Sequence, residues 1–280
     1  MKKEKIAFQG ERGAYSHIAC EELFDNLEIK TCSTFEETFK TAFEDETYKI
    51  VIPLENSLAG RVADIHYLLP KYKLQIYGEH FQKVEHNLLG KLGVEIKDIK
   101  SVRSHAQAIG QCQNIILKSK FKTIISVDTA GSAKELAEGE DKTIAAIASE
   151  LSAKIYNLKI LKKNIEDESG NITRFLIMGK NPKHPEFIKE KKFITSCIFR
   201  LKSEPSALYK SLGGFATNRI NLAKLESFSV KNTFDQVNFY LDLEGHIENK
   251  SVQNAMEELS FHTESLDILG VYEASKYREK

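Results

Sequence analysis

Short apolar runs alternate with amphipathic stretches through the first half of the chain. The runs have the length of buried strands, and the stretches between them carry apolar residues near helical spacing. This alternation of strand and helix predicts an α/β fold, with a mostly parallel sheet covered by helices. Up to residue 70 the predicted strands are 6–8, 28–32 and 49–53, and the predicted helices are 16–27 and 33–42.

The same alternation resumes at residue 74. Strands are predicted at 74–89, 99–102, 123–127 and 143–148, and helices at 107–117, 131–137 and 150–156. The first of these strands is unusually long, and we expect it to cross between two lobes. Open α/β sheets bind ligands at the carboxyl ends of their strands, so the loops at those ends are candidate sites.

The pattern breaks at residues 179–185, which hold two of the five prolines. Proline-rich, polar sequence without apolar periodicity is typical of a linker. We therefore predict a first domain at 1–180, a linker at 181–192 and a second domain at 193–280. The second domain is predicted as strand 193–201, helix 205–217, strand 222–230, strand 236–243, helix 252–261 and strand 267–272, a ferredoxin-like βαββαβ module.

Composition and charge exclude several classes of protein. Hydrophobic residues make up 41% of the 280 residues and charged residues 29%, the balance of a soluble globular protein. Forty basic residues offset forty acidic ones, so no general field draws the chain to nucleic acid or to an anionic membrane. No apolar run reaches transmembrane length, and the first residues lack the apolar segment of a signal peptide. We expect a cytoplasmic protein.

The four cysteines lie far apart and form no CxxC pair, which argues against a zinc site or a redox couple. We expect reduced, mostly buried thiols. Neither a metal nor a cofactor is expected. The cysteines are Cys20, Cys32, Cys112 and Cys197.

Residues 171–175 place a hydroxyl, a permanent cation and an aromatic ring side by side, just ahead of an apolar run. If that run is a strand, alternation sends Thr173 and Phe175 to one face and Arg174 to the other. A cation beside a hydroxyl donor suits a small anion that loses or moves a hydroxyl group. Taken alone, the segment is also compatible with a purely structural strand.

Four loops at the ends of predicted strands offer further polar groups. Helix N-termini behind the loops favour anions, although capping of turns and helices explains each loop as well when it is taken singly. Together they suit a small anionic organic acid and chemistry without a cofactor. The candidate side chains are Ser16, Glu55, Asn56, Ser57, Ser104, His105, Gln107 and Thr129.

The order of these segments resembles the catalytic domain of prephenate dehydratases. The matching segments are GERGAYSHIA, PLENSLAGRV, SHAQAIGQC, DTAGSA, AAIAS and NITRF. The part after the linker resembles the ACT domain that follows the catalytic domain in that family. The resemblance implies a cleft between two α/β lobes, similar to type II periplasmic binding proteins. It also implies conversion of prephenate to phenylpyruvate, water and carbon dioxide in phenylalanine biosynthesis.

The resemblance also implies roles for individual residues. Thr173 donates to the departing hydroxyl, and Glu55 is a second candidate for proton donor. Arg174 pairs with a substrate carboxylate, and Phe175 forms the apolar wall beside the ring. The other residues expected to line the cleft are Asn56, Ser57, Ser16, Ser104, Gln107, Thr129 and Asn171.

The ACT resemblance implies a phenylalanine site at a dimer interface, and hence a homodimer or homotetramer. The family's GAL motif stands here as Ser-Ala-Leu, and its ESRP motif as Glu-Ser-Phe-Ser. Loss of the arginine and proline predicts that feedback inhibition is altered or absent. The predicted effector residues are Ser206, Ala207, Leu208, Asn221, Leu222, Glu226 and Ser227.

Three other functions stay open. Arogenate dehydratase differs only in an amino group on the substrate side chain. A non-catalytic small-anion-binding protein with a fused regulatory domain is disfavoured by the intact segment 173–175 and by the expected lack of a signal peptide. A regulatory protein acting only through its ACT module is disfavoured by the full set of cleft loops.

Overall fold

The computed structural model describes residues 3–180, 185–230, 233 and 236–279. The chain divides into two compact units that interleave along the sequence. Unit 1 comprises Met1–Thr41, Ile50–Val62 and His80–Phe175, and unit 2 comprises Ala42–Lys49, Ala63–Glu79 and Leu176–Lys280. The domain boundaries expected from the sequence cut the chain at other places and stay a prediction. Residues 181–184 of the predicted linker lie outside the described residues.

The first sheet contains most of the strands predicted before residue 80. Its order is β2-β1-β3-β11-β5, and β4 pairs with β3. The helix predicted at 16–27 ends at Leu23, because Leu27 already begins β2 and pairs with Glu4 of β1. The elements are β1 (Glu4–Gln9), α1 (Tyr15–Leu23), β2 (Leu27–Cys32), α2 (Phe35–Glu44), β3 (Tyr48–Asn56), β4 (Gly60–Arg61), α3 (Ala63–Tyr72), β5 (Gln75–Lys83) and β11 (Ile172–Gly179).

The second sheet lies within unit 1 and has the order β10-β6-β9-β7-β8. The long strand predicted at 74–89 is two strands in different sheets, β5 and β6, and the helix predicted at 107–117 is also divided. The elements are β6 (Asn87–Gly90), β7 (Ser101–Ser104), α4 (Ala106–Gly110), α5 (Gln113–Ser119), β8 (Lys122–Ile125), α6 (Thr129–Glu138), β9 (Ile144–Ala148), α7 (Glu150–Ile155) and β10 (Lys159–Lys162).

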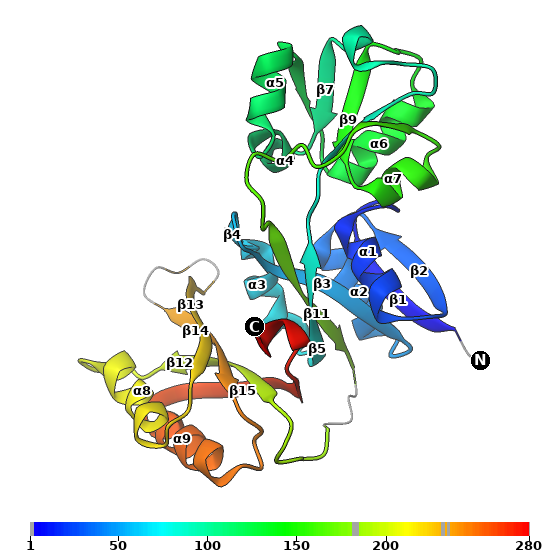
Figure 1. Ribbon diagram of the computed structural model, residues 1–280. Coiled ribbons are helices and arrows are strands. Elements are labelled where there is room, and N and C mark those ends of the chain that lie inside the picture. Colours follow the sequence, from blue (N-terminus) through cyan, green and yellow to red (C-terminus); the bar gives the residue numbers. More distant parts are fainter. Residues whose placement is uncertain (1–2, 181–184, 231–232, 234–235, 280) are drawn as a thin grey trace. The chain divides into compact units, whose positions relative to one another are not determined.

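Both faces of this second sheet are covered, as Figure 1 shows for α5 on one side of β7 and β9 and α6 on the other. Alternation along the strands explains the two layers. Leu88 packs with residues of α4 and α5, whereas its neighbour Leu89 packs with residues of α6 and α7. The sheet is mixed rather than mostly parallel, because β6 runs antiparallel to both β9 and β10.

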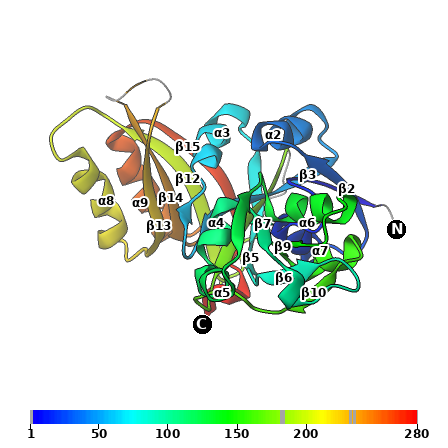
Figure 2. The same cartoon turned by 90° about the horizontal axis from the view of Figure 1, so that it is seen from above.

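The C-terminal module confirms the predicted βαββαβ order. Its antiparallel sheet has the order β13-β14-β12-β15, and α8 and α9 lie together on one face (Figures 1 and 2). On the other face His66 of α3 contacts the rings of Phe228 and Tyr240. The elements are β12 (Phe193–Leu201), α8 (Ala207–Thr217), β13 (Leu222–Ser229), β14 (Val237–Glu244), α9 (Lys250–Phe261) and β15 (Thr263–Glu273).

The four cysteines are unpaired and buried, as predicted. Burial raises the pKa of the Cys20, Cys112 and Cys197 thiols, so these thiols are protonated and unreactive at neutral pH. Among the described helices none is long and apolar enough to cross a membrane.

Candidate functional site

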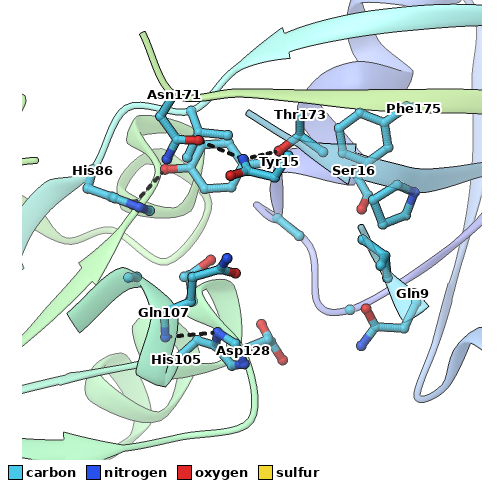
Figure 3. A pocket seen from close by; sticks show the side chains of 18 of the residues that line it. Gln9, Tyr15, Ser16, His86, His105, Gln107, Asp128, Asn171, Thr173 and Phe175 are labelled. Carbon is cyan, nitrogen blue, oxygen red and sulfur yellow. Dashed lines mark hydrogen bonds between the residues drawn. The ribbon is translucent and has the colours of Figure 1, made fainter. Parts of the chain in front are cut away.

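A cavity of about 390 Å³ lies in unit 1. Residues of strands β1, β3 and β11 line it, together with residues of α1, α2, α4 and α6 and of nearby loops. Its apolar lining includes Phe35, Val84 and Phe175, and none of the described lining residues is an arginine or a lysine. An anion in this cavity would therefore be held by neutral donors. The polar lining residues, most of them labelled in Figure 3, are Gln9, Tyr15, Ser16, Asn56, His86, His105, Gln107, Gln111, Asp128, Thr129, Asn171 and Thr173.

Strand β11 divides its side chains between the cavity and the opposite face. Thr173 and Phe175 line the cavity, whereas Arg174 lies on the other side, as alternation predicts. The Nη1 of Arg174 is 3.2 Å from the Oε1 of Glu55, and its guanidinium lies 6.0 Å from the centre of the Phe81 ring. Arg174 is 2% exposed and Glu55 31%. Neither Arg174 nor Glu55 is among the residues that line the cavity. Their side chains therefore lie outside the cavity, although both were expected to act on a substrate there.

Asn56 orients the hydroxyl of Thr173. The Oδ1 of Asn56 accepts the backbone N–H groups of Leu58 and Ala59 at 3.0 and 2.9 Å, which makes its Nδ2 the donor end. That nitrogen donates to the Oδ1 of Asn171 at 2.6 Å and to the Oγ1 of Thr173 at 3.0 Å. The Thr173 hydroxyl therefore accepts from Asn56 and keeps its own hydrogen for a group in the cavity.

The hydrogen bonds continue from Asn171 to a histidine. The Nδ2 of Asn171 donates to the Oε1 of Gln111 at 2.9 Å, and the Nε2 of His86 lies 2.9 Å from the same oxygen. The Nδ1 of His86 is 3.1 Å from the Tyr15 hydroxyl, which donates to the carbonyl of Glu85 at 2.6 Å. Burial lowers the pKa of His86 and raises that of Tyr15, so both are neutral at pH 7.

Sequence reasoning did not predict the three residues that continue this hydrogen-bonded chain from Asn171, namely Gln111, His86 and Tyr15. Tyr15 and Gln111 stand inside segments that the family resemblance had already marked, and that position was a usable signal. His86 carried no such signal. It lies between β5 and β6, in a stretch whose pattern predicts one continuous strand.

The loop at residues 10–16 is fixed to the start of α7. The carbonyl of Gly13 accepts from the hydroxyls of Ser149 and Ser152 at 2.5 and 3.0 Å. Gly13 has φ +94°, and a Cβ at this position would lie 2.8 Å from the Cα of Ser152, so only glycine fits. The loop leads into α1, whose N-cap Ala14 gives no side-chain cap. The first N–H groups of α1 are therefore open to a ligand beside Ser16.

The other predicted site residues divide into two groups. Ser16, Gln107 and Thr129 line the cavity together with Asn56, Asn171, Thr173 and Phe175. Ser104 is fully buried and donates to the carbonyl of Ile147 at 2.7 Å. Ser57 donates to the carbonyl of Gly170 and accepts the N–H of Ile172. Ser57 and Ser104 thus support the wall of the site without lining it.

The predicted effector residues gather at two elements of the C-terminal module. Ser206 is the N-cap of α8 with φ +63°, and Ala207 begins the helix. Glu226 lies in β13, where its Oε2 is 3.2 Å from the Nζ of Lys224. The helix predicted at 205–217 begins at Ala207, so Pro205 precedes it.

Comparisons with known proteins agree on one family. The family described as prephenate dehydratase matches residues 6–183. The chain is 41% identical over 276 residues to a bifunctional N-acyl-homoserine lactone acylase/prephenate dehydratase of Komagataeibacter europaeus, covering 98% of each chain. It is 37% identical to arogenate dehydratase/prephenate dehydratase 2 of Arabidopsis thaliana, covering 96% of this chain and 72% of that protein. The crystal structure of a prephenate dehydratase from Arthrobacter aurescens in complex with L-Phe has a TM-score of 0.87 at 25% identity, covering 96% and 89% of the two chains.

Proposed function

Because the chain belongs to the prephenate dehydratase family, we propose that it converts prephenate to phenylpyruvate on the route to L-phenylalanine. The family match confirms the resemblance drawn from the motifs and makes the chain an enzyme of the lyase class. The observation that carries the proposed reaction is the Thr173 hydroxyl, which accepts from Asn56 and has its hydrogen available to the cavity.

The reaction needs help mainly where the hydroxyl leaves. The bond between the ring and its carboxylate breaks, the electron pair passes through the ring, and the bond to the ring hydroxyl breaks. Carbon dioxide and water depart, and one proton is taken up. Thr173 donates to the hydroxyl as negative charge develops on it, and the Asn56 donor polarises Thr173 further. Phe175 lies beside Thr173 on the same face of β11 and gives the ring an apolar wall.

The substrate carboxylates are held without a fixed cation. The uncapped first turn of α1 at Tyr15 and Ser16 supplies N–H donors. Thr129 adds a side-chain hydroxyl at the start of α6, a helix whose N-terminus is capped by the Asp128 carboxylate. A cation clamped on the departing carboxylate would stabilise the ground state more than the transition state, in which that charge is lost. A lining whose described residues include no arginine or lysine therefore suits a decarboxylation. Arg174 is assigned instead to its contact with Glu55.

Turnover by the purified full chain tests this function. We expect phenylpyruvate from prephenate, with Thr173→Ala lowering kcat about 100-fold, in the range for loss of one transition-state donor. Thr173→Ser keeps the hydroxyl and serves as the matched control. Binding of prephenate without turnover would instead identify a non-catalytic anion-binding protein. Higher kcat/KM for arogenate would identify an arogenate dehydratase.

The C-terminal βαββαβ module is proposed to be an ACT domain that binds L-phenylalanine and joins two copies of the chain. Its element order and the L-Phe complex of the Arthrobacter relative support this. The effector side chains are proposed at the start of α8, Ser206, Ala207 and Leu208, and along β13 with the residue before it, Asn221, Leu222, Glu226 and Ser227. Titrating turnover with L-phenylalanine tests the site, and a flat response together with no heat of binding rules it out.

The acylase activity in the name of the Komagataeibacter relative is not carried over. Amide hydrolysis by a hydroxyl nucleophile needs an activating base. Among the described cavity residues, His86 contacts Tyr15 and Gln111, and His105 accepts the N–H of Gln107. Neither histidine is hydrogen-bonded to a serine or threonine of the described lining.

A further inference from the structure

A chain of side-chain hydrogen bonds along the cavity wall has its direction fixed at one end. The backbone N–H groups of Leu58 and Ala59 can only donate, so the side-chain atom of Asn56 that they contact is the oxygen. Asn56 must then donate to the oxygen of Asn171. Asn171 in turn presents its nitrogen to Gln111. Two backbone amides thus determine the orientation of three side-chain amides.

The same reasoning fixes the tautomer of His86. Gln111 faces both Asn171 and the Nε2 of His86 with one oxygen, Oε1. Because an amide oxygen only accepts, the Nε2 of His86 must carry a hydrogen. The Nδ1 of neutral His86 is then a bare acceptor, 3.1 Å from the Tyr15 hydroxyl.

Protonation of His86 would change this arrangement at Tyr15. A hydrogen on Nδ1 makes that nitrogen a donor, so the Tyr15 oxygen must accept from it and its hydrogen must stay on the carbonyl of Glu85. It would also place a positive charge in a wall whose described residues include no arginine or lysine. That charge would hold the substrate carboxylate in its ground state and oppose its loss.

We propose that His86 is a positioning residue for the reaction: its Nε2–H donates to Gln111 and supports the hydrogen bonds of Asn171 and Asn56 that aim the Thr173 hydroxyl. Turnover requires the neutral form, because a second hydrogen on Nδ1 would bring a positive charge to the cavity wall. The inference rests on the proposed function, because it assigns His86 a part in the same chemistry.

The groups around His86 determine the direction in which its pKa is shifted. Glu166 accepts the backbone N–H of His86 at 3.0 Å and its charge favours protonation. The carboxylate of Glu85 and the phenol of Tyr15 lie on the neighbouring segments, and the Cys112 thiol is close to Tyr15. Burial opposes protonation and outweighs both the hydrogen bond to Gln111 and the charge of Glu166, so the pKa of His86 lies below its ordinary value.

Two substitutions separate the positioning role from a structural one. His86→Leu removes the donor to a partly buried amide oxygen, that of Gln111, and we expect kcat to fall about tenfold or more at every pH with KM little changed. His86→Gln keeps an N–H donor but cannot be protonated. In the wild type we expect kcat and KM to fall together as the pH is lowered, which gives the kcat–pH profile an acidic limb. We expect His86→Gln to retain most of kcat and to lack this acidic limb.

The matched control is His262→Gln in unit 2, where the imidazole lies 3.2 Å from Glu204; it should leave the acidic limb unchanged. An acidic limb in His86→Gln equal to that of the wild type would overturn the proposal. So would full kcat in a folded His86→Leu protein.

Imidazole ¹⁵N NMR of the full chain gives a readout independent of turnover. We expect His86 to be neutral at pH 7 with its hydrogen on Nε2. A hydrogen on Nδ1 would overturn the inference even in an active enzyme. Conversely, a chain that shows the Nε2–H form but turns over no prephenate would overturn the proposed function and with it the assigned role of His86.

Gln111→Glu keeps the acceptor but adds a charge, and should move the acidic limb to higher pH.

Discussion

The Nδ2 of Asn56 lies 3.0 Å from the Oγ1 of Thr173, although 117 residues separate them along the chain. The contact joins the end of β3 to the start of β11. It makes Thr173 an acceptor toward the protein and so leaves it a donor toward the cavity. Asn56 thereby leaves the Thr173 hydroxyl free to act as a donor, and we assign that donation to the departing hydroxyl of the substrate.

Asn56→Asp tests the donation from Asn56 to Thr173 with almost no change in the shape of the side chain. A carboxylate cannot donate to Thr173 or Asn171, and it would face the N–H groups of Leu58 and Ala59 while adding negative charge near an anionic substrate. We expect kcat to fall about 100-fold, of the order found when a transition-state donor is lost. Steady-state kinetics on prephenate measures this.

Asn254→Asp makes the same chemical change on α9, in unit 2, and serves as the control. It should leave kcat within about twofold of the wild type, as expected of a substitution outside the cavity lining. Equal loss of activity in both variants would trace the effect to charge or folding rather than to the donor.

The sequence predicted those parts of the site that depend on local periodicity. Alternation along residues 173–175 was enough to place Thr173 and Phe175 together and Arg174 apart. The βαββαβ order followed from turn signals and apolar runs. The contact of Arg174 with Glu55 could not be foreseen, because it depends on which strand lies beside β11. His86 was not predicted for a related reason. It lies between β5 and β6, and these two strands are separate because each belongs to a different sheet.

Arg174→Met distinguishes a structural arginine from a substrate clamp. Arg174 is 2% exposed and lies 3.2 Å from Glu55, which is 31% exposed, and losing a hydrogen bond to a charged group costs about 2 kcal/mol. We expect the free energy of unfolding to fall by about that amount, with KM for prephenate little changed. Chemical denaturation and kinetics on the same preparation measure both. A large rise in KM at unchanged stability would restore Arg174 to the substrate site.

Glu55→Gln tests the same contact from the other side. The amide keeps an oxygen for the Arg174 guanidinium and removes the charge. If Glu55 were the proton donor, turnover would be abolished. We expect kcat within a few-fold of the wild type and a modest loss of stability, because Glu55 is 31% exposed and water compensates part of the change.

Gly13→Ala should disturb the loop that leads into α1. A Cβ at this position meets the backbone of Ser152 at 2.8 Å, and φ is +94°. Gly93→Ala is the matched control, because Gly93 has φ +79° and nothing within 4 Å of the added Cβ. The control should lower the free energy of unfolding only by the backbone cost of about 1 kcal/mol. Gly13→Ala should lower it clearly more and should also raise KM. Equal unfolding free energies for the two variants would show that the loop can move away from Ser152 without cost.

Two buried histidines should make the protein less stable as the pH falls. Burial lowers the pKa of His86 and of His17, against the opposing charges of Glu166 and Glu21 respectively. Below the ordinary histidine pKa of about 6.5 the unfolded chain binds protons that the folded chain does not. The unfolding free energy should therefore be full above that pH and decrease as the pH falls from it toward the lowered folded pKa values.

His17→Asn gives this pH dependence a direct test. The Nδ1 of His17 accepts the N–H of Gly13 at 3.0 Å, and an asparagine oxygen can accept the same hydrogen but cannot be protonated. The variant should lose less stability than the wild type between about pH 7 and pH 5, in urea denaturation at matched ionic strength. A slope equal to that of the wild type would mean that His17 takes up its proton as readily in the folded chain as in the unfolded one. In that case the loop at residues 10–16 would have to open in acid, because a protonated Nδ1 cannot accept from Gly13.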